Sequence, residues 1–148
     1  MDQQRGFGLI ESMVVVAVII ILAGVGIPSL QDMVVNQRMK GITNDLFTDI
    51  LRARSEAIKR NTSVTMSPAT NWEKGWRIPS PANNAILLAS HAAVPNVTIT
   101  GPASLTYNAT GRVSGATSPK FEVTASNGNK RCITVDLGGR PNVQPKSC

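Results

Sequence analysis

The sequence contains few of the side chains from which most enzymes build their active sites. Its 148 residues include one histidine and two cysteines, and only 4% are aromatic and 16% charged. These residues are too few for a zinc site with the usual four His or Cys ligands. His91 lies in the stretch SHAAVP, and the chain has no GxSxG, GxxxxGK[ST] or GxGxxG motif. We therefore predict that the protein is not an enzyme and uses no cofactor or metal ion.

The apolar residues, 42% of the chain, are concentrated near the N-terminus. Phe7 to Ile27 reads FGLIESMVVVAVIIILAGVGI, in which Glu11 and Ser12 are the strongly polar positions. At about 1.5 Å per residue, a helix of this length crosses the hydrocarbon core of a bilayer. The run is longer than the apolar part of a cleaved secretory signal. A carboxylate in hydrocarbon is costly unless it is paired, so Glu11 is a candidate functional residue; the alternative is that it lies at the membrane surface.

The string RGFGLIE at residues 5–11, followed by the apolar run, resembles the type IV prepilin signal. The resemblance implies that a prepilin peptidase cuts after Gly6 and that the new N-terminal residue, Phe7, is N-methylated. It also implies that Pro28 kinks the helix and that Glu11 neutralises the α-amino group of a neighbouring subunit. A buried ion pair penalises a wrong register more than it adds stability, so Glu11 is predicted to align subunits in a filament.

This resemblance further implies a location and a set of partners. We expect a single-pass inner-membrane protein with its globular part in the periplasm, which becomes extracellular when assembled in a pilus. The expected partners are the prepilin peptidase, membrane lipid, and other pilins or pseudopilins, which contact the N-terminal helix. The expected segments are a leader peptide (1–6), a transmembrane and polymerisation helix (7–28), an amphipathic helix half (29–60) and a β-rich periplasmic domain (61–148).

After Pro28 the apolar pattern becomes that of an amphipathic helix. Apolar residues recur at intervals of three or four, which predicts a helix that continues to about Arg60. The stripe consists of Val35, Met39, Ile42, Leu46, Ile50, Ala53 and Ala57. We expect it to pack against a sheet, with the charged residues on the opposite, solvated face.

From Asn61 onward, short β-prone runs alternate with Gly, Pro, Asn and Ser. The predicted strands are Val64–Met66, Ile86–Leu88, Val97–Thr100, Leu105–Tyr107, Phe121–Ala125 and Cys132–Leu137. Asn127-Gly128 suits the positive φ angles of a tight turn and predicts a hairpin between the last two. In its second strand, Ile133, Val135 and Leu137 should point inward. Between Trp72 and Ala93 we expect an irregular loop and one strand, with Trp72 and Trp76 covering the core.

The two cysteines are predicted to pair, because the prepilin-like anchor implies a periplasmic location, where disulfides persist. A bond between Cys132 and Cys148 would close a loop of about 17 residues and contribute about 3 kcal/mol. It would hold the tail PNVQPKSC against the last strand. The alternative is two free thiols.

Positive charge is concentrated at the C-terminal end. Residues 108–148 hold 6 basic and 2 acidic residues of a chain whose net charge is +6. The candidate phosphate-binding cations are Arg112, Lys130, Arg131, Arg140 and Lys146. Because aromatic side chains for base stacking are scarce there, a nucleic-acid role of this patch would favour double-stranded DNA over single strands. A solvated basic surface is the alternative.

The tail CITVDLGGRP resembles the FimT/GspH group, which includes minor pilins of type IV pili and the H pseudopilin of type II secretion. Some FimT-like members bind DNA in natural transformation through a Gly-Arg-x-Arg motif. Gly139 and Arg140 match that motif, but Asn142 stands where the second Arg would be.

Taken together, the resemblances imply an α+β type IV pilin fold, with a long N-terminal helix packed on a C-terminal antiparallel sheet. The expected function is that of a minor pilin or pseudopilin, a low-copy subunit that primes or caps filament assembly. The alternatives are a FimT-like DNA receptor and the H pseudopilin of type II secretion.

Overall fold

The computed structural model describes residues 8–148, apart from the side chains of residues 25–29. Gly6 and Phe7, the predicted cleavage and methylation residues, lie outside the described residues, as does the side chain of Pro28. The chain forms two compact units, residues 1–34 and residues 35–148.

Helix α1 (Leu9–Arg60) contributes to both units and ends at the residue predicted from the amphipathic pattern. The helical assignment is not interrupted at Pro28. In the first unit, the long apolar side chains that the structure describes, between Leu9 and Leu22 and between Leu30 and Val34, are exposed. Among the residues that the structure describes, no helix is both long and apolar enough to cross a membrane.

In the second unit, α1 buries the predicted apolar stripe. Leu46, Ile50, Ala53 and Ala57 are fully buried, Met39 and Ile42 are nearly so, and Val35 packs partly against the core. The intervening polar position Thr43 is also buried, and its hydroxyl donates to the Met39 carbonyl oxygen at 2.7 Å. The stripe prediction is confirmed because a spacing of three or four residues keeps these side chains on one helix face.

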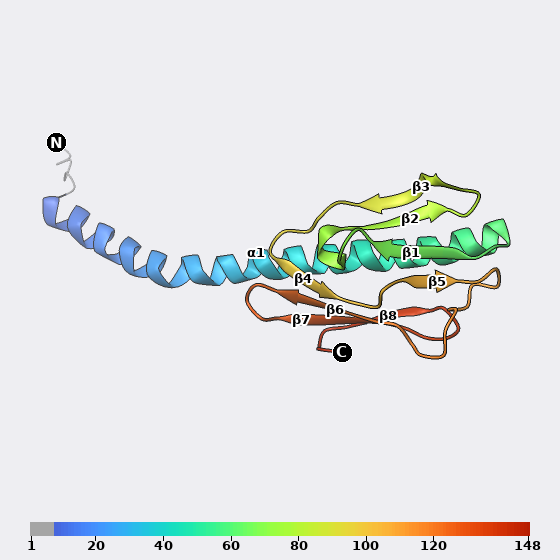
Figure 1. The fold of residues 1–148 in the computed structure, drawn as a ribbon. Helices are drawn as coiled ribbons and strands as arrows, with labels where there is room; N and C mark the ends of the chain where they lie inside the picture. Colours follow the sequence, from blue (N-terminus) through green and yellow to red (C-terminus); the bar gives the residue numbers. More distant parts are fainter. Residues whose placement is uncertain (1–7) are drawn as a thin grey trace, which may run out of the picture. The chain divides into compact units, whose positions relative to one another are not determined.

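Two antiparallel four-stranded sheets complete the second unit, where a single sheet was predicted (Figure 1). The first has the order β3-β2-β1-β5 and the second the order β4-β6-β7-β8. The strands are β1 (Val64–Pro68), β2 (Trp76–Ser80), β3 (Asn83–His91), β4 (Val97–Thr100), β5 (Leu105–Tyr107), β6 (Lys120–Ala125), β7 (Lys130–Val135) and β8 (Pro141–Gln144). Inward-facing residues of both sheets share one hydrophobic core with α1.

Two strands and a short helix were missed by the sequence pattern. Between Trp72 and Ala93 the chain forms the 3₁₀ helix η1 (Trp72–Lys74) and two strands, β2 and β3, so the prediction of one strand was wrong. Strand β2 reads WRIPS and buries Trp76, Ile78 and Ser80. Its proline and the polar residue Ser80 at a buried position obscure the alternation in the sequence. Strand β8 reads PNVQ, which has a single β-branched residue, and forms because its backbone pairs with β7.

The predicted hairpin joins β6 to β7, and Gly128 in its turn has φ of 83°. Ile133 and Val135 are fully buried, as predicted. Leu137 is not: β7 ends at Val135, and the chain turns at residues 136–139, which leaves Leu137 39% exposed. The alternation rule fails there because it applies only while the backbone remains extended.

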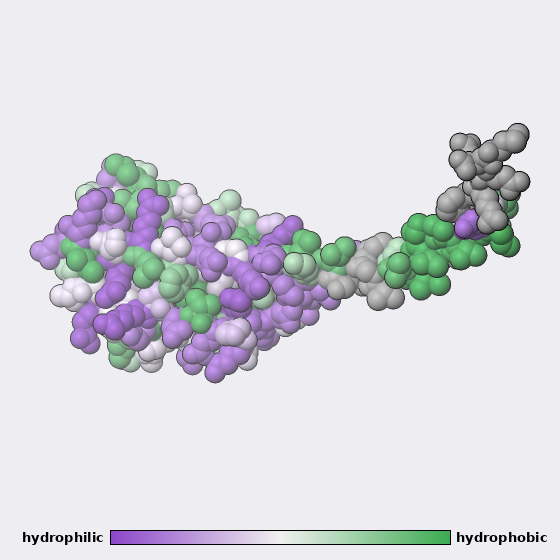
Figure 2. All heavy atoms as spheres, turned by 180° about the vertical axis from the view of Figure 1, so that it is seen from behind, coloured by the Kyte–Doolittle hydropathy of each residue, from purple (hydrophilic) through white to green (hydrophobic). Residues whose placement is uncertain are grey.

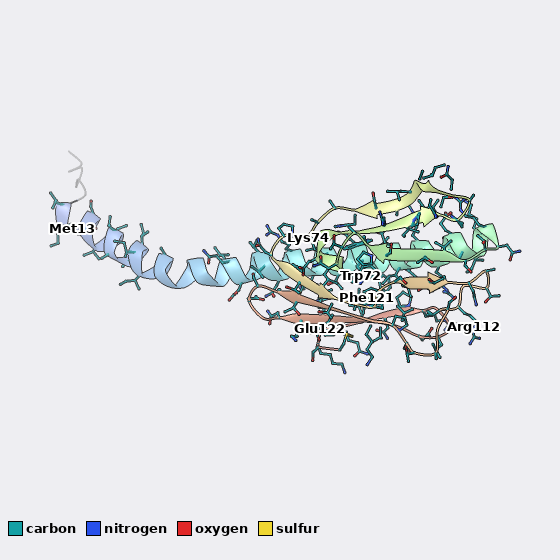
Figure 3. The ribbon with its side chains drawn as sticks, viewed as in Figure 1. Met13, Trp72, Lys74, Arg112, Phe121 and Glu122 are labelled. Atoms are coloured by element: carbon teal, nitrogen blue, oxygen red, sulfur yellow. A yellow bond between two sulfur atoms is a disulfide. The ribbon has the colours of Figure 1, made fainter. Side chains whose placement is uncertain are left out.

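Both tryptophans lie in the core, as predicted. Trp72 meets the ring of Phe121 edge-on, with centroids 4.8 Å apart, and its indole N–H donates to the Pro102 carbonyl oxygen at 2.7 Å (Figure 3). Trp76 donates to Asp49 Oδ2 at 2.8 Å and stacks on the His91 ring at 4.1 Å. The lone histidine therefore covers a core tryptophan. Within the described residues, no three His, Cys, Asp or Glu side chains lie close enough to hold a metal ion.

Candidate functional site

The first candidate site is the apolar segment of α1 from Leu9 to Leu22. Its long apolar side chains are 47–81% exposed, whichever side of the helix they occupy. Figure 2 shows them as a continuous hydrophobic surface, whereas hydrophilic residues dominate the visible face of the second unit. A helix that is hydrophobic all round is stable only when lipid or other protein surrounds it. The segment therefore requires a partner outside this chain.

Glu11 lies within this apolar surface, in the first turns of the helix, and its side chain is exposed. Its backbone N–H donates to the Gly8 carbonyl oxygen at 3.1 Å, so the helix begins just before it. The flanking residues Ile10 and Met13 are 76% and 63% exposed. Any partner that covers these side chains will also remove water from the carboxyl group, which then needs a counter-charge.

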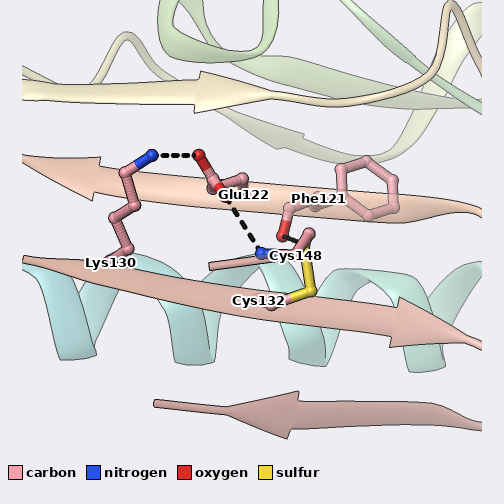
Figure 4. Close-up of a disulfide and its surroundings, with 5 residues drawn as sticks. All are labelled: Phe121, Glu122, Lys130, Cys132 and Cys148. Atoms are coloured by element: carbon pink, nitrogen blue, oxygen red, sulfur yellow. Dashed lines mark hydrogen bonds and ion pairs between the residues drawn. A yellow bond between two sulfur atoms is a disulfide. The ribbon is translucent and has the colours of Figure 1, made fainter. Parts of the chain in front are cut away.

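The disulfide between Cys132 and Cys148 is present, with an S–S distance of 2.05 Å (Figure 4). Cys132 lies on β7, opposite Glu122 of β6. The Cys148 backbone N–H donates to Glu122 Oε2 at 3.0 Å, and Lys130 Nζ lies 2.8 Å from Glu122 Oε1. The hydrogen bond from Lys130, helped by that from Cys148, holds the pKa of Glu122 below its ordinary value. The C-terminal residues are thus fixed against the hairpin, as predicted.

Arg54 joins the helix to two turns, a role that the sequence pattern did not indicate. Its Nε donates to the Gly111 carbonyl oxygen at 3.0 Å and its Nη2 to the Gly138 carbonyl oxygen at 3.3 Å. Beside it, the buried Tyr107 hydroxyl donates to the Gly139 carbonyl oxygen at 3.4 Å. Burial raises the pKa of Tyr107. In the sequence, the glycines at 111, 138 and 139 indicate two turns, but nothing there indicates that Arg54 bonds to them.

The five predicted phosphate-binding cations do not gather in one place. Arg112 and Arg140 flank the point where the turns at Gly111 and Gly139 touch. Lys130 and Arg131 lie at the opposite end of β7. Pro141, the residue after Arg140, pairs with Val135. Val135 is four residues beyond Arg131, which is about 13 Å along an extended strand. In Figure 3, Arg112 lies among the loops beyond one end of the second sheet, whereas Glu122, the partner of Lys130, lies on β6.

The second group lines a shallow depression of about 450 Å³. Lys130 and Arg131 come from the start of β7, Lys146 from the C-terminal tail, and Lys40 from α1. The sequence reading missed Lys40 because it counted charge along the chain, and Lys40 is distant from the others in sequence. The rest of the lining consists of Asn36, Met39, Gly128, Asn129, Pro145 and Ser147.

Comparison with known proteins places these features in context. Residues 43–139 match the family described as Type II transport protein GspH, and residues 1–27 match the prokaryotic N-terminal methylation motif. Prepilin peptidase-dependent protein D of Escherichia coli (strain K12) is 34% identical over 109 residues, which are 71% of this chain and 68% of that protein.

Solved structures show the same fold. Two crystal structures of the type IV minor pilin FimU of Pseudomonas aeruginosa align with TM-scores of 0.65 and 0.63, at 20% and 21% identity. They cover 74% and 72% of this chain and 90% and 92% of their own chains. The α+β arrangement predicted from the sequence, a long N-terminal helix packed on antiparallel strands, is confirmed.

Proposed function

This chain belongs to the GspH family of minor pilins and pseudopilins, and on that premise we propose that it is a low-copy subunit that primes or caps the assembly of a type IV pilus or pseudopilus. The family consists of structural proteins rather than enzymes, in agreement with the sequence prediction. The N-terminal methylation motif implies processing by the prepilin peptidase and assembly with other pilins.

The observation that carries the proposal is the uncovered apolar surface of α1 between Leu9 and Leu22. Before assembly, the inner membrane would cover it; after assembly, the helices of other subunits would do so. Both environments exclude water, so the transfer between them costs little hydrophobic free energy. Cleavage after Gly6 would leave an α-amino group at Phe7, and Glu11 would neutralise the corresponding group of a neighbouring subunit.

The choice between a pilus and a type II secretion pseudopilus depends on the partners. The matching family is described as a type II transport protein, and the solved structures of similar fold are those of a type IV minor pilin. A deletion strain scored for secretion and for twitching motility distinguishes the two: the H pseudopilin predicts loss of secretion, and a pilus subunit predicts loss of twitching.

The assembly role is tested by Glu11→Val, with Ser12→Val as the matched control. Both substitutions make the segment more apolar, so membrane insertion and processing should be retained. Only Glu11→Val removes the counter-charge for the α-amino group, and we expect it to abolish incorporation into filaments. Incorporation is measured by immunoblotting of sheared filaments, and mass spectrometry checks that each chain starts at a methylated Phe7. Normal incorporation of Glu11→Val would contradict the assigned role.

Duplex DNA binding is a second candidate function, supported by Arg112 and Arg140. Both side chains are exposed beside the Gly111–Gly139 contact, and neither forms a side-chain hydrogen bond or ion pair within the described part of the chain. Two unpaired arginines beside turns that touch suit adjacent phosphates.

We expect Arg112→Gln/Arg140→Gln to reduce the slope of log affinity against log salt by about 2 on duplex DNA. The matched control is Arg77→Gln/Lys120→Gln, which removes two exposed charges elsewhere. Fluorescence anisotropy of labelled duplex, with the detergent-solubilised chain at several salt concentrations, gives the slope. An equal change in the control would mean that only net charge matters.

A further inference from the structure

The basic depression is assembled from three separate parts of the second unit. It is lined by α1 near Lys40, by the β6–β7 turn and the start of β7, and by the C-terminal tail at Lys146. The turn is tied to the helix by Asn129 Nδ2, which donates to Asn36 Oδ1 at 2.7 Å. The tail is tied to β7 by the disulfide at Cys148, two residues beyond Lys146. The cations are therefore brought together by fixed contacts.

Most of the cations in this depression have no partner within the described part of the chain. Lys130 is paired with Glu122, but Lys40, Arg131 and Lys146 form no side-chain hydrogen bond or ion pair with other described residues. Gly128 leaves open space at its rim, because no atom lies within 4 Å of the position that a Cβ would occupy. Three unpaired cations around an open concavity favour an anionic ligand with more than one acceptor oxygen.

The size of the depression and its place in the sequence favour a small phosphate-bearing ligand over DNA. Specific protein–DNA interfaces bury on the order of 1,000 Å² or more of protein surface, and Arg112 and Arg140 lie at the far end of β7. No aromatic side chain lines the depression, so bases would find no stacking surface. A volume of about 450 Å³ instead fits a single phosphate-bearing headgroup. In the sequence, Asn36, Met39 and Lys40 follow closely on the exposed apolar residues Leu30, Met33 and Val34.

We propose that this depression binds the phosphate headgroup of an anionic phospholipid while the subunit is held in the inner membrane. The inference rests on the proposed membrane-anchored pilin, since the depression includes the part of α1 that follows the anchor in the sequence, and its cations attract anionic headgroups. Lys40, Arg131 and Lys146 contact the phosphate oxygens, and the Lys130–Glu122 pair forms the edge of the site. Departure into a filament would exchange this lipid contact for contacts with other subunits.

The test is a calorimetric titration of the full chain in non-ionic detergent with dihexanoyl phosphatidylglycerol. Dihexanoyl phosphatidylcholine, inorganic phosphate and a short DNA duplex serve as comparison ligands. We expect phosphatidylglycerol to bind most tightly, and Lys40→Gln/Lys146→Gln to weaken its binding roughly 30-fold. Arg77→Gln/Lys120→Gln, the matched control, should weaken it less than about twofold, because screened charges outside the site contribute little.

Several results would overturn the inference. Equal affinity for phosphatidylcholine would show that headgroup charge is not recognised, and equal affinity for inorganic phosphate would show a free-anion site. Tighter binding of the duplex would assign the depression to DNA. Equal losses in both double variants would show an effect of net charge alone. None of these results affects the Glu11→Val assembly test, so the lipid site and the filament role fail separately.

Discussion

Among single residues, Gly111 and Gly139 lie in two turns of the second unit that pack closely together. Gly139 has φ of 86°, and a Cβ there would lie 2.0 Å from the Gly111 carbonyl oxygen and 3.0 Å from Tyr107 Cε1. Arg54 hydrogen-bonds to both turns, so the backbone has little room to move. Glycine is required at 139 for its conformation and for its size.

We predict that Gly139→Ala lowers the free energy of unfolding by about 2–5 kcal/mol, the sum of left-handed strain and a backbone clash. The matched control is Gly128→Ala: Gly128 has φ of 83° but open space around it, so only the strain of about 1–2 kcal/mol applies. Urea denaturation of the detergent-solubilised chain, followed by tryptophan fluorescence, measures both. Equal losses would show that the turn contact contributes nothing.

At the scale of elements, α1 combines two surfaces with different requirements. Its first part exposes apolar side chains on all sides, while its second part buries one stripe and exposes the rest. The difference follows from the sequence, which is uniformly apolar to Ile27 and has a three-to-four residue period afterwards. The element therefore carries the proposed assembly surface and also packs against both sheets.

The supporting role predicts unequal effects for two leucines of α1. Leu46 is fully buried among residues of the core, whereas Leu51 is 39% exposed. We expect Leu46→Ala to cost about 2–5 kcal/mol of unfolding free energy, because it leaves a cavity beneath the sheets. Leu51→Ala should cost less than about 1 kcal/mol, since no enclosed cavity forms. Thermal unfolding followed by circular dichroism distinguishes them, and equal destabilisation would contradict the assigned packing.

At the scale of the whole molecule, the disulfide fixes the last residues of the chain to the second sheet. Because it closes the loop that contains β8 and Lys146, its removal affects both stability and the basic depression. We predict that Cys132→Ser/Cys148→Ser lowers the free energy of unfolding by about 3 kcal/mol through the gain in unfolded-chain entropy. It should also weaken phosphatidylglycerol binding, since Lys146 is then no longer held in place.

Ser147→Ala, which leaves the bond intact, is the control for the tail. Urea denaturation of both variants under non-reducing conditions gives the difference. A disulfide variant as stable as the unchanged chain would show that β8 alone, paired with β7 from Cys132 to Val135, holds the tail.

Features that depend on local pattern could be predicted from the sequence alone. These features are the apolar run, the prepilin-like string around Gly6 and Glu11, the buried stripe and the β6–β7 hairpin. They could be predicted because hydrophobic period and turn chemistry act over a few residues. The family resemblance was confirmed, and so was the disulfide, whose prediction needed the compartment that the resemblance implies.

Features that depend on contacts between distant segments became visible only in the folded protein. Strand β8 exists because β7 supplies its hydrogen bonds, and Leu137 is exposed because the chain turns after Val135. The hydrogen bonds from Arg54 to two turns, and the division of the cations into two groups, depend on which turns meet in space. Lys40 joins Lys146 because α1 and the tail lie on the same side of the hairpin turn, a proximity that charge counted along the chain does not show.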